Sequence, residues 1–155
     1  MPTHAEKRHL PHTPDQMFDL VADVERYPEF LPWCVAARIR RRAGDVFFAD
    51  LVIGFKMVRE RYTSKVTLDR AGQSIDVTYT EGPFHHLDNH WRFEPAPDGG
   101  CIIDFYVDFE FRSRILQTLI GAVFNEAVRL MVHAFEKRAR LIYGADGGVA
   151  ARPTA

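Results

Sequence analysis

Cysteine is scarce in this chain. Among 155 residues only Cys34 and Cys101 occur, and they form no CxxC pair. Disulfide scaffolds and structural zinc sites need several cysteines or histidines at short, regular spacings, so the sequence favours neither class. We interpret both thiols as reduced and half-buried, which is typical of proteins in a reducing compartment.

Long apolar runs and an excess of one charge are also lacking. No uninterrupted apolar stretch reaches the roughly 18 residues that cross a bilayer, and Met1-Pro2-Thr3-His4 begins no signal-peptide core. The 20 basic and 21 acidic residues leave a formal net charge of -1, so no global field attracts DNA. We therefore expect a cytoplasmic protein without a DNA partner, whose contact with a membrane is limited to a peripheral position on the inner face of the inner membrane.

Phenylalanine, by contrast, is abundant, with 12 residues that fall mostly in regular segments. Between residues 34 and 112, apolar and polar residues alternate with a period of two. Turn sequences separate these runs at Ala43-Gly44-Asp45, Ala71-Gly72-Gln73, Gly82-Pro83 and Pro97-Asp98-Gly99-Gly100. The pattern predicts an antiparallel meander with one dry and one wet face. Residues 5–10 add a short edge strand.

Two segments have helical periodicity instead. Thr13, Pro14 and Gln16 form a capping-box pattern that begins a short helix running to about Asp23. Residues 114–143 carry a broad apolar stripe, which we assign to Leu116, Leu119, Ile120, Val123, Phe124, Ala127, Leu130, Met131, Ala134, Phe135, Leu141 and Ile142. Only the dry face of the sheet offers a matching surface for this long helix, and Gly144 suits its C-terminal end.

The predicted fold class is therefore α+β. A curved antiparallel sheet of six or seven strands wraps around the long C-terminal helix, and a short N-terminal helix completes one domain over residues 1–144. Residues 145–155 are small and glycine-rich and are expected to be disordered. Because aromatic and polar residues share the inner face, and a buried carboxylate without a partner is costly, we expect an internal apolar cavity rather than a filled core.

Four motifs resemble a known family. The longest runs from Phe18 to Cys34 (FDLVADVERYPEFLPWC), and three shorter ones are RERYTSKV at 59–66, EGPF at 81–84 and FEKRA at 135–139 before Tyr143-Gly144. Together they are similar to the START-like, helix-grip proteins of the coenzyme Q-binding and ribosome-association-toxin family, within the polyketide cyclase/dehydrase superfamily. The resemblance covers the chain from about Lys7 to Gly144.

The resemblance implies a cavity that binds ubiquinone or a similar isoprenoid quinone without covalent chemistry, as ligand rather than cofactor, in support of respiration or quinone synthesis. A cofactor and a metal are not expected. The residues expected to line the ligand site come from the inner faces of the strands, the apolar loop and the long helix: Phe30, Trp33, Leu51, Ile53, Phe55, Glu60, Tyr62, Ser64, Tyr79, Phe84, Asn89, Trp91, Phe105, Phe109, Phe124 and Met131.

Several interpretations stay open at this point. Glu60 is in phase with Tyr62 and Val66, so it should face the cavity, where it orients a head group, ties strands together at the rim, or acts as the base of a cyclase-like enzyme. The loop from Tyr27 to Trp33 either plugs the core or forms the cavity mouth. The resemblance also implies an alternative function of a different class. One bacterial branch of the family consists of toxins that bind the ribosome and block the association of its subunits.

Two polar clusters have ordinary explanations. Arg38, Arg40 and Arg42 should share the solvated outer face of a strand while Arg41 points the other way, although such a run could also contact lipid head groups or rRNA phosphates. His85, His86 and His90 have no further ligand at a known metal spacing. We interpret these histidines as solvated.

Overall fold

The computed structural model describes residues 3–31, 33–55 and 58–144, without the side chains of Phe55 and Val58. The predicted disorder of residues 145–155 lies outside the described residues. Seven antiparallel strands form one sheet in the order β1-β7-β6-β5-β4-β3-β2, so that β1 and β2 lie at its edges. The strands are β1 (Thr3–Leu10), β2 (Cys34–Ala43), β3 (Val46–Phe55), β4 (Val58–Asp69), β5 (Ser74–Glu81), β6 (Phe84–Pro95) and β7 (Cys101–Phe111).

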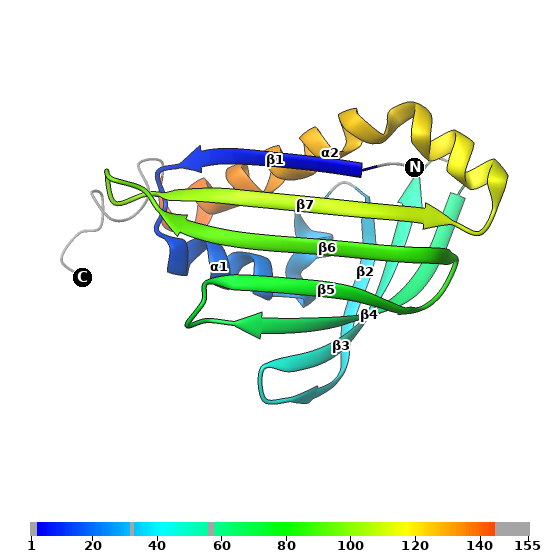
Figure 1. Cartoon of the computed structure of the whole chain (residues 1–155), viewed down its shortest axis with the longest axis horizontal. Helices are drawn as coiled ribbons and strands as arrows, with labels where there is room; N and C mark the ends of the chain where they lie inside the picture. Colours follow the sequence, from blue (N-terminus) through cyan, green and yellow to red (C-terminus); the bar gives the residue numbers. More distant parts are fainter. Residues whose placement is uncertain (1–2, 32, 56–57, 145–155) are drawn as a thin grey trace.

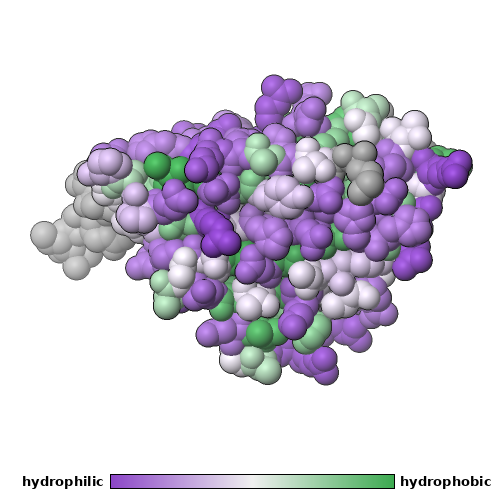
Figure 2. All heavy atoms as spheres, viewed as in Figure 1, coloured by the Kyte–Doolittle hydropathy of each residue, from purple (hydrophilic) through white to green (hydrophobic). Residues whose placement is uncertain are grey.

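The sheet curves around the long helix α2 (Arg114–Tyr143), as predicted. Figure 1 shows β5, β6 and β7 in front of the helices, β1 passing alongside α2, and β2 farther back where the sheet curves around. The face turned toward the viewer in Figure 2 is mostly hydrophilic, which matches a sheet with its outer side in water. The core therefore lies between the inner face of the sheet and the helices.

Alternation along the strands decides which residues enter this core. In β7 the alternate residues Cys101, Ile103 and Phe105 are buried, and so are Phe109 and Phe111 farther along. Cys101 is fully buried rather than half-buried as the sequence suggested, whereas Cys34 is partly exposed, and both are free thiols. The predicted inward faces of β3, β4, β5 and β6 agree with this register.

The N-terminal helix α1 (Pro14–Ala22) begins at the predicted capping box, in which the Thr13 side chain accepts from the Gln16 backbone and the Gln16 side chain accepts from the Thr13 backbone. A 3-10 helix η1 (Val24–Glu29) follows and includes Pro28. The prolines do exclude an α-helix here, but the tighter helix tolerates one of them, which the sequence interpretation had missed.

Helix α2 has the predicted bounds but presents a different face to the core. Its buried residues are Phe124, Val128, Val132, Phe135 and Ala139, and three of these (Val128, Val132 and Ala139) were absent from the predicted stripe. Leu141, Ile142 and Leu130 were assigned to it, yet they are 78%, 49% and 45% exposed. The helix carries more apolar residues than one side can bury, so composition alone could not choose among them.

By length and composition, α2 also qualifies as a candidate membrane span, the one such helix in the described part of the chain. A helix at the centre of a soluble domain has the same composition, because one side of it must be apolar to pack on the sheet. Packing against the inner face of the sheet accounts for only part of this hydropathy, because only 17% of the most apolar stretch of α2 is buried.

The arginine run in β2 departs from simple alternation. The pairing of β2 with β3 shifts register between Ile39 and Arg41, which reverses the phase of the strand. As a result Arg41 lies opposite Phe48, and Arg42 lies over the ring of the buried Phe47 at 4.5 Å. The prediction that Arg42 shares the outer face with Arg38 and Arg40, and that Arg41 opposes them, was wrong because a β-bulge cannot be seen in the sequence pattern.

The outer face of the sheet contains one buried carboxylate, Asp50, which is 6% exposed. Its oxygens accept hydrogen bonds from the Thr63 hydroxyl at 2.6 Å and from the Arg61 guanidinium at 3.1 Å. Arg40 approaches to 3.5 Å and Arg38 to 3.9 Å. Burial alone would raise the pKa of Asp50, but the Thr63 and Arg61 hydrogen bonds and the Arg40 charge outweigh it and lower the pKa.

We expect Asp50→Asn to destabilise the protein by about 1–3 kcal/mol at pH 7, because the arginines lose their counter-charge and a buried hydrogen-bond network is altered. Since the folded pKa lies below the unfolded value of about 3.9, the carboxylate stabilises the fold above about pH 4. This contribution is lost as the pH falls through the folded pKa. Urea denaturation at pH 7 and below pH 4 measures both effects, with the exposed Asp45→Asn as control. Identical pH profiles for wild type and Asp50→Asn would contradict the prediction.

Candidate ligand-binding cavity

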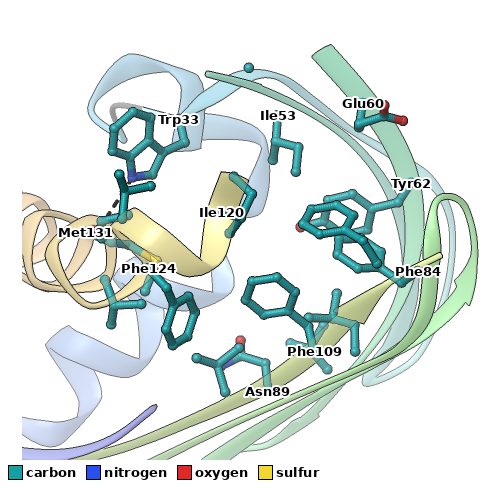
Figure 3. Close-up of a pocket in the computed structure, with 18 of the residues that line it drawn as sticks. Trp33, Ile53, Glu60, Tyr62, Phe84, Asn89, Phe109, Ile120, Phe124 and Met131 are labelled. Carbon is teal, nitrogen blue, oxygen red and sulfur yellow. Dashed lines mark hydrogen bonds between the residues drawn. The ribbon is translucent and has the colours of Figure 1, made fainter. Parts of the chain in front are cut away.

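The space between the sheet and α2 contains a large, almost entirely apolar cavity of about 260 Å³, which we call the helix chamber. One wall comes from α2 and the opposite wall from β6 and β7, and Figure 3 shows their side chains converging on it. The lining residues are Trp33, Ile53, Gly54, Glu60, Tyr62, Val77, Phe84, Leu87, Asn89, Phe105, Val107, Phe109, Phe111, Ile120, Val123, Phe124, Ala127, Val128 and Met131.

A second cavity of about 200 Å³, the loop chamber, lies under α1, η1 and the loop that follows them. It is more polar than the helix chamber. Its lining comprises Val21, Val24, Tyr27, Leu31, Trp33, Cys34, Leu51, Ile53, Tyr62, Ser64, Val66, Ile75, Val77, Asn89, Trp91, Met131 and Phe135.

The two chambers adjoin each other. Six residues line both: Trp33, Ile53, Tyr62, Val77, Asn89 and Met131. Pockets for small ligands commonly measure about 300–1,000 Å³, a range that neither chamber reaches alone but that the two reach together. The shared side chains are therefore the partition that a long ligand would have to pass.

The apolar segment from Tyr27 to Trp33 packs against α2 and contributes to the walls of the chambers. The sequence left open whether it plugs the core or forms the cavity mouth. The ring of Phe135 on α2 meets Tyr27 and Phe30 at centroid distances of 5.4 and 5.2 Å, and the Tyr27 hydroxyl donates to the Val21 carbonyl. Trp33 lines both chambers, and its indole Nε1 donates to the Ala127 carbonyl at 3.4 Å. The loop thus plugs the core at Phe30 and forms the cavity wall at Trp33.

Most polar groups on the inner face are already hydrogen-bonded. The Asn89 amide donates to the Tyr106 carbonyl at 2.8 Å, and its oxygen accepts from the Trp91 indole at 2.9 Å. The Ser64 hydroxyl is different. It is buried and has no hydrogen-bond partner among the described residues, a state it shares there only with single nitrogen atoms of His12 and Arg138.

The titratable groups of the loop chamber are held in their neutral forms. Burial raises the pKa of Tyr27 and that of Tyr62, and the proximity of the two phenols adds to the effect on Tyr27. Burial also raises the pKa of the Cys34 thiol to about 11. At neutral pH the chamber therefore presents hydroxyl and thiol groups without charge.

Tyr62 is closely approached by a glycine with a positive φ. Gly82 has a φ of +142°, and a Cβ atom there would lie 2.6 Å from Tyr62 Cβ. Only glycine lets the turn between β5 and β6 pass so closely over β4. The Tyr62 ring also packs edge-on against Phe84, with the ring centroids 5.2 Å apart. These contacts fix the ring in its place between the two chambers.

Glu60 lies at the rim of the helix chamber and is partly exposed. Its carboxylate points away from the ring cluster formed by Tyr62, Phe84 and Phe109 in Figure 3. The side chain is therefore on the expected face of β4, but its charge lies toward the edge of the cavity rather than at its centre.

The structure brings most of the predicted site residues together. The helix chamber contains Trp33, Ile53, Glu60, Tyr62, Phe84, Asn89, Phe105, Phe109, Phe124 and Met131, and the loop chamber adds Leu51, Ser64 and Trp91. Phe30 and Tyr79 lie behind the lining, where Phe30 packs on Phe135 and the Tyr79 hydroxyl accepts from the Phe84 backbone. The side chain of Phe55 lies outside the described residues.

Sequence reasoning missed other lining residues, among them Val77, Leu87, Val107 and Phe111 of the sheet and Ile120, Val123, Ala127 and Val128 of α2. Those on the strands could have been found, because they alternate in phase with predicted neighbours. On α2, Ile120, Val123 and Ala127 belonged to the predicted apolar stripe but were not assigned to the site. Val128 was absent from the stripe, because the sequence does not specify the rotation of the helix about its axis.

Two of the three clustered histidines contact carboxylates on the outer face of the sheet. His86 contacts Asp108 at 3.1 Å and His90 contacts Asp76 at 2.7 Å. Within residues 3–31, 33–55 and 58–144, no group of three or more potential ligands could hold a metal ion.

The sequence matches the model of the family described as polyketide cyclase / dehydrase and lipid transport over residues 10–136. It is 41% identical over 134 residues to the ribosome association toxin RatA of Rickettsia prowazekii, covering 84% of this chain and 91% of that protein. It is 39% identical over 144 residues to the mitochondrial coenzyme Q-binding protein COQ10 homolog B of Xenopus laevis, covering 91% of this chain but 59% of the frog protein.

Solved structures of similar proteins have the same fold as this chain. An 18 kDa protein of Caulobacter crescentus shares 38% identity at a TM-score of 0.77, covering 94% of this chain and all 100% of that one. An aromatase/cyclase from a Streptomyces species reaches a TM-score of 0.82 at 18% identity, covering 94% of this chain and 98% of the other. The second likeness shows a common fold and no more.

Proposed function

Because the chain belongs to the polyketide cyclase / dehydrase and lipid transport family, we propose that it is a non-catalytic carrier of ubiquinone or a similar isoprenoid lipid. The observation that supports this most is the pair of adjoining chambers beneath α2, which offer a long apolar space with a few polar groups at one end. A lipid with a polar ring at one end and an apolar tail at the other matches this distribution of polar and apolar groups in the cavity. The name of the frog relative, a coenzyme Q-binding protein, points to the same ligand.

The nucleophilic groups in the cavity support binding rather than chemistry. A serine nucleophile needs an adjacent base to remove its proton, and the Ser64 hydroxyl has no hydrogen-bond partner among the described residues. Cys34, with a pKa of about 11, stays a thiol at neutral pH and is a weak nucleophile. If the protein is instead a cyclase-like enzyme, turnover of a polyketide substrate should depend on Glu60.

Identification of the native ligand tests the proposal directly. Protein purified from its own host should release an isoprenoid quinone on organic extraction, detectable by mass spectrometry. Added quinone should also quench the fluorescence of Trp33 and Trp91, which line the chambers, and raise the melting temperature. If extraction yields no quinone and added quinone changes neither signal, the carrier proposal is rejected.

Loading from a bilayer would require an apolar edge near the cavity. Ile115 and Leu119 on α2 are 80% and 37% exposed, and they directly precede Ile120 and Val123 of the helix chamber. This end of α2 is our proposed site of peripheral membrane contact. Flotation with vesicles should weaken for the double variant Ile115→Ser and Leu119→Ser.

A second function, interference with ribosomal subunit association, is favoured by the names of several relatives and by the arginines of the outer face. Arg38 and Arg61 are 72% and 66% exposed at their side chains, although Asp50 neutralises part of their charge. Overexpression followed by sucrose-gradient sedimentation would then show free subunits accumulating at the expense of whole ribosomes.

Two sets of variants separate the functions. Reversing an outer charge with Arg38→Glu, whose side chain is 72% exposed, should weaken a ribosome effect and leave quinone binding intact. Filling the helix chamber at Ala127 should do the opposite. Loss of both activities in both variants would show that the two surfaces are not independent.

A further inference from the structure

Ser64 stands out among the buried polar residues. Its side chain belongs to the lining of the loop chamber, and the residue is only 1% exposed. Its Oγ atom has no hydrogen-bond partner among the described residues. An unpaired buried hydroxyl is unfavourable because it loses its hydrogen bonds to water without replacing them.

The surroundings of Ser64 explain why it finds no acceptor. On the inner face of the sheet it lies beside Ala49 of β3 and Tyr79 of β5. Ala49 is fully buried and offers no side-chain acceptor, and the Tyr79 hydroxyl is engaged with the Phe84 backbone. An alanine at position 64 would fit the same space without leaving a polar atom unpaired.

The other polar groups of the loop chamber are either engaged or neutral. Asn89 uses its amide nitrogen and its oxygen within the sheet, and the Tyr27 hydroxyl donates to Val21. Tyr62 lies on the same face of β4, two residues from Ser64, and belongs to the partition between the chambers. Its hydroxyl is protonated at neutral pH, as an ordinary tyrosine is, and burial raises its pKa further.

We propose that the loop chamber holds the ring of a carbonyl-bearing head group, to which Ser64 donates a hydrogen bond, while the apolar tail passes the Tyr62 partition into the helix chamber. This assignment rests on the proposed carrier function and adds the direction in which the ligand lies. A quinone ring offers carbonyl oxygens that accept hydrogen bonds, so one of them would be the missing acceptor for the Ser64 hydroxyl. The chamber contains no charged side chain in its lining, and an ionic head group would be buried there without a counter-charge.

Glu60 is a less suitable partner for the ring. It lies at the rim of the helix chamber and its carboxylate points outward. An ionised carboxylate has no proton to donate and would repel a carbonyl oxygen. The head group therefore belongs at the opposite end of the cavity from Glu60, with the tail toward the exposed end of α2.

The variant Ser64→Ala tests the assignment because it should change stability and affinity in opposite directions. Without ligand, we expect a melting temperature equal to or above that of wild type, since an unpaired hydroxyl is removed. The affinity for a ubiquinone with two isoprene units should fall roughly five-fold, as one neutral hydrogen bond is lost. The affinity for a geranyl hydrocarbon, which has the tail but no ring, should not change. Quenching of tryptophan fluorescence measures both affinities.

Ser74→Ala is the matched control, because Ser74 is a serine on the neighbouring strand β5 that is 7% exposed and lines neither chamber. It should leave both affinities as in wild type. Equal affinities of wild type and Ser64→Ala for the quinone, or an equal loss for the quinone and the hydrocarbon, would overturn the head-group assignment but leave the carrier function standing. A lower melting temperature of ligand-free Ser64→Ala would also overturn it, by showing that the hydroxyl is already paired. If wild type binds neither probe, the carrier function itself fails.

Discussion

Ala127→Phe is expected to weaken quinone binding by roughly 70-fold while the protein stays folded. Ala127 lies on the side of α2 that lines the helix chamber, so a phenyl ring there would occupy much of the volume of about 260 Å³ that we assign to the tail. Excluding roughly 100 Å² of apolar ligand surface removes about 2.5 kcal/mol at about 25 cal/mol per Å², which corresponds to that loss of affinity.

The stability of ligand-free Ala127→Phe should change by less than about 1 kcal/mol, since the added ring enters existing space rather than displacing packed atoms. Ala122→Phe provides the control, because Ala122 is on the same helix but exposed. Fluorescence titration with a short-chain ubiquinone should show wild-type affinity for Ala122→Phe. Unchanged affinity of Ala127→Phe would mean that the ligand does not use the helix chamber.

Phe135→Ala should cost about 3–5 kcal/mol of unfolding free energy, the usual range for removing a fully buried phenylalanine. Phe135 is 2% exposed, and its ring contacts Tyr27, Phe30 and Trp91 at centroid distances of 5.4, 5.2 and 5.2 Å. It thereby joins the loop, the sheet and α2. A domain of this size has a total stability of about 5–15 kcal/mol, so the loss is a large fraction.

Urea denaturation of the ligand-free protein measures this effect. Ile115→Ala is the control on the same helix, because Ile115 is 80% exposed and its truncation should change stability by less than about 0.5 kcal/mol. A loss below about 1 kcal/mol for Phe135→Ala would show that the loop and α2 are not held together through this ring, and that the walls of the loop chamber have another support.

The polar residues of the inner face illustrate how far a sequence pattern can reach. Alternation along β4 indicated that Glu60, Tyr62 and Ser64 share one face, and the structure confirms this. The pattern did not distinguish among the three, although one is a rim carboxylate, one a partition between chambers and one an unpaired hydroxyl. That distinction depends on the neighbours contributed by β3, β5 and the loop, which lie far away in sequence.

By itself, the sequence determined the elements and their faces. The period of two defined the strands, the Thr13 capping box marked the start of α1, Gly144 marked the end of α2, and the motif from Phe18 to Cys34 indicated the family. These features are local, because they arise from backbone geometry and from the burial of one face of each element. The tertiary structure alone decided which side of α2 faces the sheet, where the bulge in β2 turns Arg42 onto Phe47, and that two adjoining chambers remain between the layers. Each of these features depends on how side chains from distant segments fill a shared volume. The hydrophobic pattern indicates which residues are buried, but it does not specify how they pack together.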